Sequence, residues 1–213
     1  MSQLRVTEIF LSLQGEGRSA GFPTVFVRLT GCPLRCSYCD TSYAFSGGDW
    51  LSLEQILQQV SALKVEYVCV TGGEPLAQKG CLPLLSALCD AGYRVSLETS
   101  GALDIGVVDE RVIRVMDLKT PASGEAERNM MTNLDALETK DQVKFVISNR
   151  ADYEWSREQM QRFRIAQKCE VLFSPAQGQM EPTELAEWML EDRLQARLQL
   201  QLHKLLWGDQ AGR

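Results

Sequence analysis

The chain has 213 residues, of which 45% are hydrophobic and 23% are charged, and its formal net charge is −6 at pH 7. This length and composition predict one globular domain spanning residues 1–213, and they exclude a disordered chain, a collagen-like repeat and a coiled coil. The sequence has no basic run, no apolar run of the roughly 20 residues that span a bilayer and no secretion signal, so we expect a cytoplasmic protein that binds neither nucleic acid nor a membrane.

The first half of the chain alternates segments typical of strands with segments typical of helices. Four segments rich in β-branched and aromatic residues predict strands: Val6–Leu11, Thr24–Thr30, Tyr67–Thr71 and Tyr93–Leu97. Helices are predicted at Leu53–Leu63, where Ser52 can cap the first turn, and at residues 81–91, which Gly92 ends. Residues 31–49 are rich in Gly, Pro and Ser and predict a loop.

The second half continues the same alternation. Strands are predicted at Val112–Met116, Gln142–Ile147, Glu170–Phe173 and Leu198–Leu202. Helices are predicted at Tyr153–Ala166 and at Pro182–Glu191, which a proline opens. In the last predicted strand the leucines alternate with Gln199, Gln201 and His203. We therefore expect its polar face to line a site while the leucines pack outward.

Strands that alternate with helices and lack strict polar alternation are typical of a parallel sheet covered by helices. Six of the predicted strands end in polar segments that contain Gly or Pro, and in α/β barrels such segments build the functional site. A closed eightfold barrel typically needs about 250 residues. The sequence therefore predicts an α/β fold of the partial, open (β/α) barrel type, with about six parallel strands.

Three of the seven cysteines lie close together, at Cys32, Cys36 and Cys39. Three thiolates on a short loop can hold three irons of a [4Fe–4S] cluster, which leaves the fourth iron open to a small molecule. A structural zinc site is a second interpretation, but it needs further ligands and the only histidine is His203. Three unliganded thiols are a third. Small buried side chains are expected at the other cysteines, Cys69, Cys81, Cys89 and Cys169.

The cysteine spacing occurs together with Tyr38 and with Gly72-Gly73-Glu74-Pro75 after the strand at Tyr67–Thr71. This combination resembles the radical S-adenosylmethionine (radical SAM) superfamily. Within it, further motifs are similar to those of the 7-carboxy-7-deazaguanine synthase family and cover nearly the whole chain: Leu13-Gln14-Gly15-Glu16-Gly17, Arg28, Gly31-Cys32-Pro33, Cys39-Asp40-Thr41, Glu98-Thr99-Ser100-Gly101 and His203-Lys204.

The resemblance implies a carbon–nitrogen lyase with a [4Fe–4S] cluster, S-adenosylmethionine and Mg²⁺ as cofactors. Such enzymes convert 6-carboxy-5,6,7,8-tetrahydropterin to 7-carboxy-7-deazaguanine with loss of ammonia, a step toward queuosine-type tRNA bases. The resemblance also implies an external reductant such as flavodoxin or ferredoxin, and a homodimer is the default expectation. Because the chemistry belongs to the deoxyadenosyl radical, no side chain is expected as a catalytic acid or base.

The resemblance also implies site residues of three kinds. The cluster is expected on Cys32, Cys36 and Cys39, and Mg²⁺ on Thr41. The substrate is expected at Leu13, Gln14, Gly15, Glu16, Arg28, Thr99 and His203. S-adenosylmethionine is expected at Tyr38, Cys39, Asp40, Gly72, Gly73, Glu74, Gly101, Asp117, Leu118, Lys119, Ser174, Pro175, Ala176 and Gln177.

Arg28 also has an interpretation from geometry. Alternation along Thr24–Thr30 puts Phe26 and Arg28 on the face opposite Val25, Val27 and Leu29. An arginine inside a small barrel needs an anionic partner, and its planar guanidinium suits a carboxylate. That partner is either the substrate carboxylate, as the resemblance implies, or Glu16 or Glu98 in an internal ion pair.

Other positions keep a purely structural interpretation beside the functional one. The Gly-Gly-Glu-Pro segment and Ser174-Pro175 also fit ordinary turns, Asp40 and Thr41 also fit a brace for the cysteine loop, and His203 also fits a surface residue.

Two other functions remain open at this stage. A radical SAM activase would place a glycyl radical on a partner protein, but the Leu-Gln-Gly-Glu-Gly motif and the terminal histidine argue against it. A non-catalytic iron–sulfur electron carrier normally supplies a fourth cluster ligand, and it would have no use for Gly72–Pro75.

Overall fold

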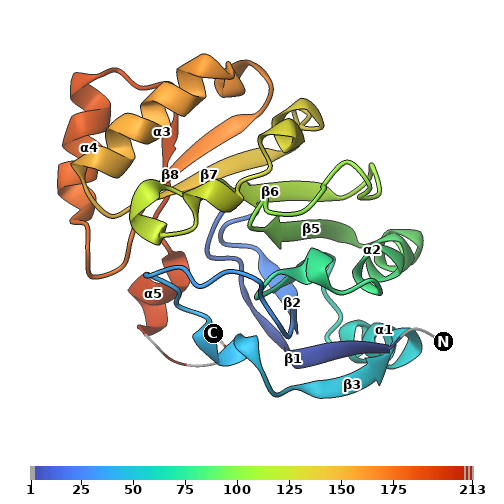
Figure 1. Cartoon of the computed structure of the whole chain (residues 1–213). Coiled ribbons are helices and arrows are strands. Elements are labelled where there is room, and N and C mark those ends of the chain that lie inside the picture. Colours follow the sequence, from blue (N-terminus) through green and yellow to red (C-terminus); the bar gives the residue numbers. More distant parts are fainter. Residues whose placement is uncertain (1–2, 209, 211, 213) are drawn as a thin grey trace.

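The computed structural model describes residues 3–208, 210 and 212, and these residues contain a nine-stranded sheet in the order β3-β1-β2-β4-β5-β6-β7-β8-β9 (Figure 1). The strands are β1 Gln3–Leu13, β2 Pro23–Leu29, β3 Asp49–Ser52, β4 Tyr67–Gly72, β5 Arg94–Thr99, β6 Ile113–Asp117, β7 Gln142–Ile147, β8 Glu170–Pro175 and β9 Arg197–Leu198. The helices are α1 Leu53–Ala62, α2 Cys81–Asp90, α3 Arg150–Arg162, α4 Pro182–Glu191 and α5 Leu202–Trp207.

The sheet is an open, mostly parallel barrel, as predicted. Strands β2 and β4 to β8 run parallel to one another, and the two-residue β9 extends this run at one edge. Strands β1 and β3 add an antiparallel pair at the other edge. The two edge strands are not paired with each other, so the barrel does not close.

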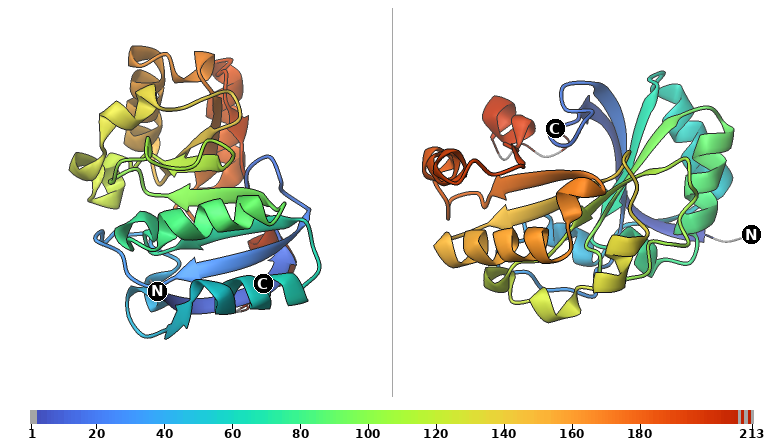
Figure 2. Two further views of the ribbon diagram at one scale, coloured as in Figure 1. Left: turned by 90° about the vertical axis from the view of Figure 1, so that its right-hand side faces the viewer. Right: turned by 90° about the horizontal axis from the view of Figure 1, so that it is seen from above.

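The outer face of the curved sheet is apolar and covered by helices (Figure 2). Val25, Val27 and Leu29 of β2 lie on this face and pack with residues of α1 and α2. Phe26 and Arg28 line a cavity on the opposite face. The predicted alternation of β2 is therefore confirmed, and it leaves the inner face of the sheet free for polar side chains.

Side-chain caps explain where two helices begin. The Ser52 hydroxyl accepts a hydrogen bond from the Gln55 N–H, and the Gln55 side chain accepts one from the Ser52 N–H, as a capping box. The predicted Ser52 cap is thus confirmed. Helix α3 begins at Arg150, three residues before the predicted start at Tyr153, because the Asn149 side chain accepts a hydrogen bond from the Asp152 N–H. It ends at Arg162, shortly before the left-handed Arg164.

The predicted last strand, Leu198–Leu202, is wrong. Only Arg197–Leu198 pairs with β8, and helix α5 begins at Leu202. The buried Gln199 side chain accepts a hydrogen bond from the Gly17 N–H at 3.0 Å, and the Leu202 N–H donates to the Gly15 carbonyl at 3.1 Å. These bonds tie the segment to the loop between β1 and β2, where it cannot continue the sheet.

Two further features concern the surface and the termini of the described chain. None of its helices is both long enough and apolar enough to cross a membrane. Beyond Trp207 the structure describes only residues 208, 210 and 212.

Candidate functional site

A cavity of about 240 Å³ opens at the carboxyl ends of β4 to β8. Its floor is formed by Thr71, Glu98, Asp117, Lys144 and Ser174, one residue from each of these strands. The cysteine loop covers one side, and residues from the β1–β2 loop and from the start of α5 cover the other. This is the end of a (β/α) barrel where functional sites are built.

All three clustered cysteines line the cavity and are half-buried. The loop is held by the Gly31 N–H, which donates to the Ala44 carbonyl at 2.8 Å, and by the Ser37 N–H, which donates to the Ser123 carbonyl at 3.0 Å. Burial raises the pKa of Cys32 and of Cys36. Within the described ranges, no three His, Cys, Asp or Glu side chains are arranged to hold a single metal ion.

The other four cysteines lie away from this cavity. Cys69, Cys81 and Cys169 are buried, and Cys89 is half-buried against the outer core. Burial raises the pKa of Cys81 to about 12 and that of Cys169 to about 11. These thiols are therefore protonated packing groups, as expected.

Gly72 and Gly73 bring the end of β4 against the cysteine loop. Gly72 has φ = +151°, and a Cβ there would meet the Leu29 backbone. A Cβ on Gly73 would meet the Gly31 carbonyl and would lie 2.7 Å from Cys32 Cβ. The Glu74 N–H donates to the Gly31 carbonyl at 2.8 Å and fixes this approach.

Glu74 itself does not line the cavity. It is fully buried, and its carboxylate accepts hydrogen bonds from the Thr99 hydroxyl at 2.9 Å and from the Ser100 N–H at 2.7 Å. The carboxylate therefore joins the turn after β4 to the turn after β5. Three other predicted site residues also lie outside the cavity lining, namely Gly15, Gly101 and Leu118.

Arg28 points into the cavity and is paired with an acid that the sequence did not single out. Its Nε lies 2.7 Å from Glu8 Oε1, and the Tyr43 hydroxyl donates to the same oxygen at 2.9 Å. The candidates Glu16 and Glu98 are not its partners in the described contacts. The guanidinium lies 5.8 Å from the Phe10 ring centroid. Within the described residues its two terminal nitrogens have no hydrogen-bond partner, so they are available to an anion.

Asp40 and Thr41 lie where the cysteine loop meets the chain's last helix. The Thr41 hydroxyl donates to Asp40 Oδ1 at 2.7 Å, and Gln201 Nε2 donates to Asp40 Oδ2 at 3.3 Å. Burial favours the neutral acid, but the Thr41 bond and the charge of Lys144 outweigh it and lower the pKa of Asp40. His203 lines the same side, and burial lowers its pKa, so the imidazole is neutral at pH 7.

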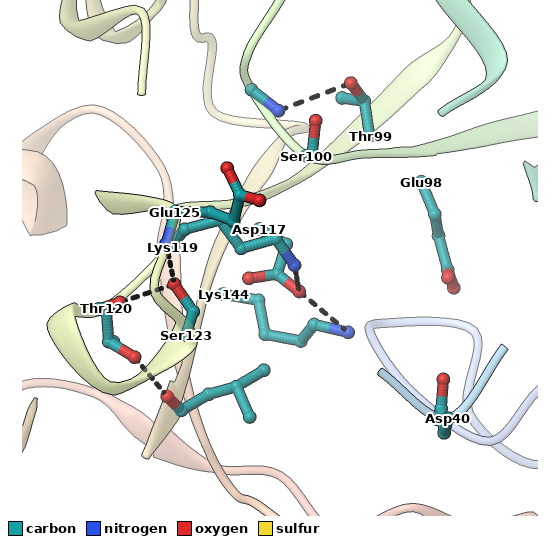
Figure 3. A network of polar contacts seen from close by, with 12 residues as sticks. Asp40, Glu98, Thr99, Ser100, Asp117, Lys119, Thr120, Ser123, Glu125 and Lys144 are labelled. Atoms are coloured by element: carbon teal, nitrogen blue, oxygen red, sulfur yellow. Dashed lines mark hydrogen bonds and ion pairs between the residues drawn. The ribbon is translucent and has the colours of Figure 1, made fainter. Parts of the chain in front are cut away.

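A buried charge network occupies the centre of the barrel. Lys144 Nζ lies 2.6 Å from Glu16 Oε2 and 3.9 Å from Asp117 Oδ2, and Lys119 Nζ lies 2.9 Å from that same Asp117 oxygen. Figure 3 shows the two lysines converging on Asp117, with Glu98 nearby. Burial raises the pKa of Glu98, although Lys144 opposes this shift. Burial would lower the pKa of Lys144, but Glu16 and Asp117 raise it well above its ordinary value.

The remaining predicted residues are also brought to this cavity. Ser174, Pro175, Ala176 and Gln177 follow β8, and Tyr38 lies next to Lys119, whose Nζ is 5.8 Å from the ring centroid. Leu13, Gln14 and Thr99 line it as well. Gln201, which the sequence analysis placed on the polar face of the last segment, lines the cavity. The sequence analysis missed Glu8, Tyr43 and Lys144. Only Lys144 had a visible signal, a lysine in the middle of the apolar segment Gln142–Ile147.

Three comparisons with known proteins agree with this geometry. Residues 26–172 match the model of the Radical SAM superfamily. The chain is 46% identical to the 7-carboxy-7-deazaguanine synthase of Chlorobaculum tepidum over 98% of this chain and 96% of that protein, and 43% identical to that of Koribacter versatilis over 96% and 97%. The crystal structure of QueE from Escherichia coli superposes with a TM-score of 0.79 at 23% identity, covering 94% of this chain and 95% of that one.

Proposed function

Since this chain belongs to the radical SAM superfamily and, within it, to the 7-carboxy-7-deazaguanine synthase family, we propose that the cavity at the carboxyl ends of β4 to β8 is where that family's reaction takes place. The chain is a carbon–nitrogen lyase of queuosine-precursor biosynthesis. Its substrate is 6-carboxy-5,6,7,8-tetrahydropterin, and its products are 7-carboxy-7-deazaguanine and ammonia. Atoms balance without a net oxidant or reductant. The observation that supports this best is the joint presence of three cysteines, Arg28 and a buried polar floor in one cavity.

The cysteine loop fits a [4Fe–4S] cluster. Cys32, Cys36 and Cys39 line the cavity, and Gly73 places no side chain against Cys32. These three thiolates would hold three irons. When bound, the reduced cluster with S-adenosylmethionine supplies a 5′-deoxyadenosyl radical that takes a hydrogen atom from C6 of the pterin.

The ends of the strands would hold S-adenosylmethionine. Gly72 and Gly73 would let the backbone approach its methionine part, and Ser174–Gln177, Tyr38, Asp117 and Lys119 line the same cavity. Glu74, Gly101 and Leu118 would act from outside the lining. The buried Glu74 carboxylate keeps the turns after β4 and β5 in register, so it positions Thr99 and Ser100.

Arg28 would bind the substrate carboxylate. Its Nε is held by Glu8, which leaves the terminal nitrogens to form a bidentate pair with a carboxylate. Gln14, Glu16, Thr99 and the neutral His203 offer donors and acceptors to the pterin edge. Leu13 would pack against its ring, and Gly15 leaves room for His203, because a Cβ there would meet the imidazole.

Thr41 would contribute an oxygen ligand to Mg²⁺, with the ionised Asp40 close by. A hard cation of this kind takes few protein oxygens and keeps several waters. The Thr41 hydroxyl now donates to Asp40, so it would have to turn its oxygen toward the metal. Mg²⁺ would then stabilise negative charge on substrate oxygens as the ring rearranges.

The setting of the enzyme is also part of the proposal. An external one-electron donor such as flavodoxin or ferredoxin would reduce the cluster. A homodimer is favoured by the exposed leucines of α5, Leu205 and Leu206, which are 67% and 51% exposed. Seven cysteines without a disulfide are consistent with a reducing cytoplasm.

Anaerobic reconstitution separates this function from its alternatives. The reduced protein should convert 6-carboxytetrahydropterin and S-adenosylmethionine to a product lighter by one ammonia, as seen by mass spectrometry, and Cys36→Ala should not. An electron carrier would leave S-adenosylmethionine uncleaved. An activase of glycyl radicals would cleave it but leave the pterin unchanged.

A further inference from the structure

A second cavity, of about 200 Å³, lies at the opposite end of the barrel. Tyr67, Arg94, Ile113 and Gln142 line it, and these are the first residues of β4, β5, β6 and β7. The β1–β2 loop covers it with Arg18, Ser19 and Phe22. We call it the rear cavity. The cavity described above, at the carboxyl ends of the same strands, is the front cavity.

The two cavities are separate, and they share part of their lining inside the barrel. Four residues line both of them: Gln14, Glu16, Glu98 and Val115. In a closed (β/α) barrel, layers of branched aliphatic side chains fill this interior. Here, three of the four shared residues are polar, so a thin polar partition separates the front of the barrel from the rear. A buried polar interior is costly unless its groups are paired.

One polar group in the rear cavity has no partner. Gln142 is 1% exposed, and its Oε1 has no hydrogen-bond donor within the described part of the chain. Its amide orientation is fixed, because Nε2 donates to Glu170 Oε2 at 3.2 Å. An unpaired buried acceptor can take a hydrogen bond from a small donor such as water or ammonia. Glu98 adds a second acceptor on the inner side.

The rim of the rear cavity does not repel such a guest. Arg18 lies 3.0 Å from Glu170 and Arg94 lies 2.6 Å from Glu66, so both rim cations are paired with acids. Phe22 and Tyr67 form the apolar part of the rim, with ring centroids 4.9 Å apart. The path from the partition to the surface is therefore lined by acceptors inside and by neutralised charges outside.

We propose that the rear cavity is the exit path for the ammonia released by the reaction. This inference rests on the proposed function, in which the front cavity is filled by cluster, S-adenosylmethionine and pterin during turnover. Ammonia leaves the pterin beside Gln14, Glu16 and Glu98, passes the partition, and reaches solvent past Gln142. The deazaguanine product is too large for this path and leaves from the front once S-adenosylmethionine is no longer packed over it.

Ser96 offers the substitution that tests the path. It lies on the inner face of β5, two residues before Glu98. It lines the rear cavity and not the front cavity. Ser96→Phe should fill the path without touching the front cavity, and Ser61→Phe on the exposed face of α1 is the matched control. In rapid-quench assays, the first turnover of Ser96→Phe should match wild type, while later turnovers slow by about fivefold or more, because product release becomes limiting.

Equal steady-state rates in folded Ser96→Phe, Ser61→Phe and wild type would overturn the exit path. Absence of any first-turnover product in wild type would instead overturn the proposed function. If Ser96→Phe does not fold, Ser96→Cys on a Cys89→Ser background replaces it. N-ethylmaleimide should then modify the introduced thiol in holoenzyme saturated with S-adenosylmethionine and slow only the later turnovers. A thiol that stays unmodified there, or modified enzyme with unchanged turnover, would contradict the proposal.

Discussion

Replacing Lys144 is the most severe test of the buried charge network in the barrel interior. Its ammonium lies 2.6 Å from Glu16 and 3.9 Å from Asp117, and its side chain is 12% exposed. Lys144→Met keeps most of the side-chain volume but removes the charge, which leaves buried carboxylates without their cation. Removing one partner of a buried ion pair costs about 3–5 kcal/mol of folding free energy. We expect a loss of that size at pH 8.

The loss should depend on pH in a defined direction. Burial already raises the pKa of Glu98 above its unfolded value, and loss of Lys144 should raise it further. An acid whose pKa is higher in the folded than in the unfolded protein binds its proton more tightly in the folded state. The stability that it adds is therefore present at low pH, and it is lost as the pH rises through the pKa of the folded state. The loss of folding free energy caused by Lys144→Met should therefore be complete at pH 8 and smaller at pH 5.5.

Urea denaturation of the apo protein under reducing conditions, at both pH values, measures this effect. The matched control is Lys168→Met, which removes a more exposed lysine paired with Asp135 at 2.9 Å. Such surface pairs contribute about 0–1 kcal/mol. The reasoning is refuted if Lys144→Met and Lys168→Met destabilise equally, or if the Lys144→Met penalty is the same at pH 8 and pH 5.5.

Three further predictions concern the front cavity. Arg28→Ala should weaken pterin binding by about ten- to a hundredfold, the value of a lost hydrogen bond to a charged group. Calorimetry should show unchanged binding of S-adenosylmethionine to this variant. Glu8→Gln, which keeps the guanidinium, should weaken pterin binding much less. Thr41→Ala should shift the Mg²⁺ titration of product formation to higher concentration with the cluster absorbance intact, and superimposable titrations would leave Thr41 as a brace of the loop. Gly73→Ala should lower the iron content after reconstitution, because the new Cβ meets the Gly31 carbonyl, whereas Gly106→Ala, where the nearest contact is a flexible Asp104 carboxylate, should not.

Local sequence patterns were sufficient to predict many of the residues that line the cavity. Alternation along β2 placed Arg28 on the inner face, and the three cysteines Cys32, Cys36 and Cys39 lie with Gly72 and Gly73 at the cavity. These signals depend on residues close together in the chain. The strands that build the floor were predicted for the same reason, since each is a compact apolar segment.

Contacts between distant segments could not be predicted in this way. Glu8 pairs with Arg28 because the antiparallel register of β1 and β2 sets them opposite each other, and the register depends on the loop between the strands. The last segment alternates like a strand, yet the bond between Gln199 and Gly17, 182 positions apart, removes it from the sheet. Glu74 carried a motif-based prediction of direct cofactor contact, but its carboxylate is occupied by Thr99 and Ser100.

The proposed function requires that one cavity brings the cofactor and C6 of the pterin together. The most direct measurement uses 6-carboxytetrahydropterin deuterated at C6, with reconstituted and reduced enzyme, and quantifies deuterium by mass spectrometry in the 5′-deoxyadenosyl group of recovered S-adenosylmethionine and 5′-deoxyadenosine. Deuterium in that group, formed together with 7-carboxy-7-deazaguanine, is the predicted result. Formation of 5′-deoxyadenosine without deuterium, with the pterin recovered unchanged, would contradict it.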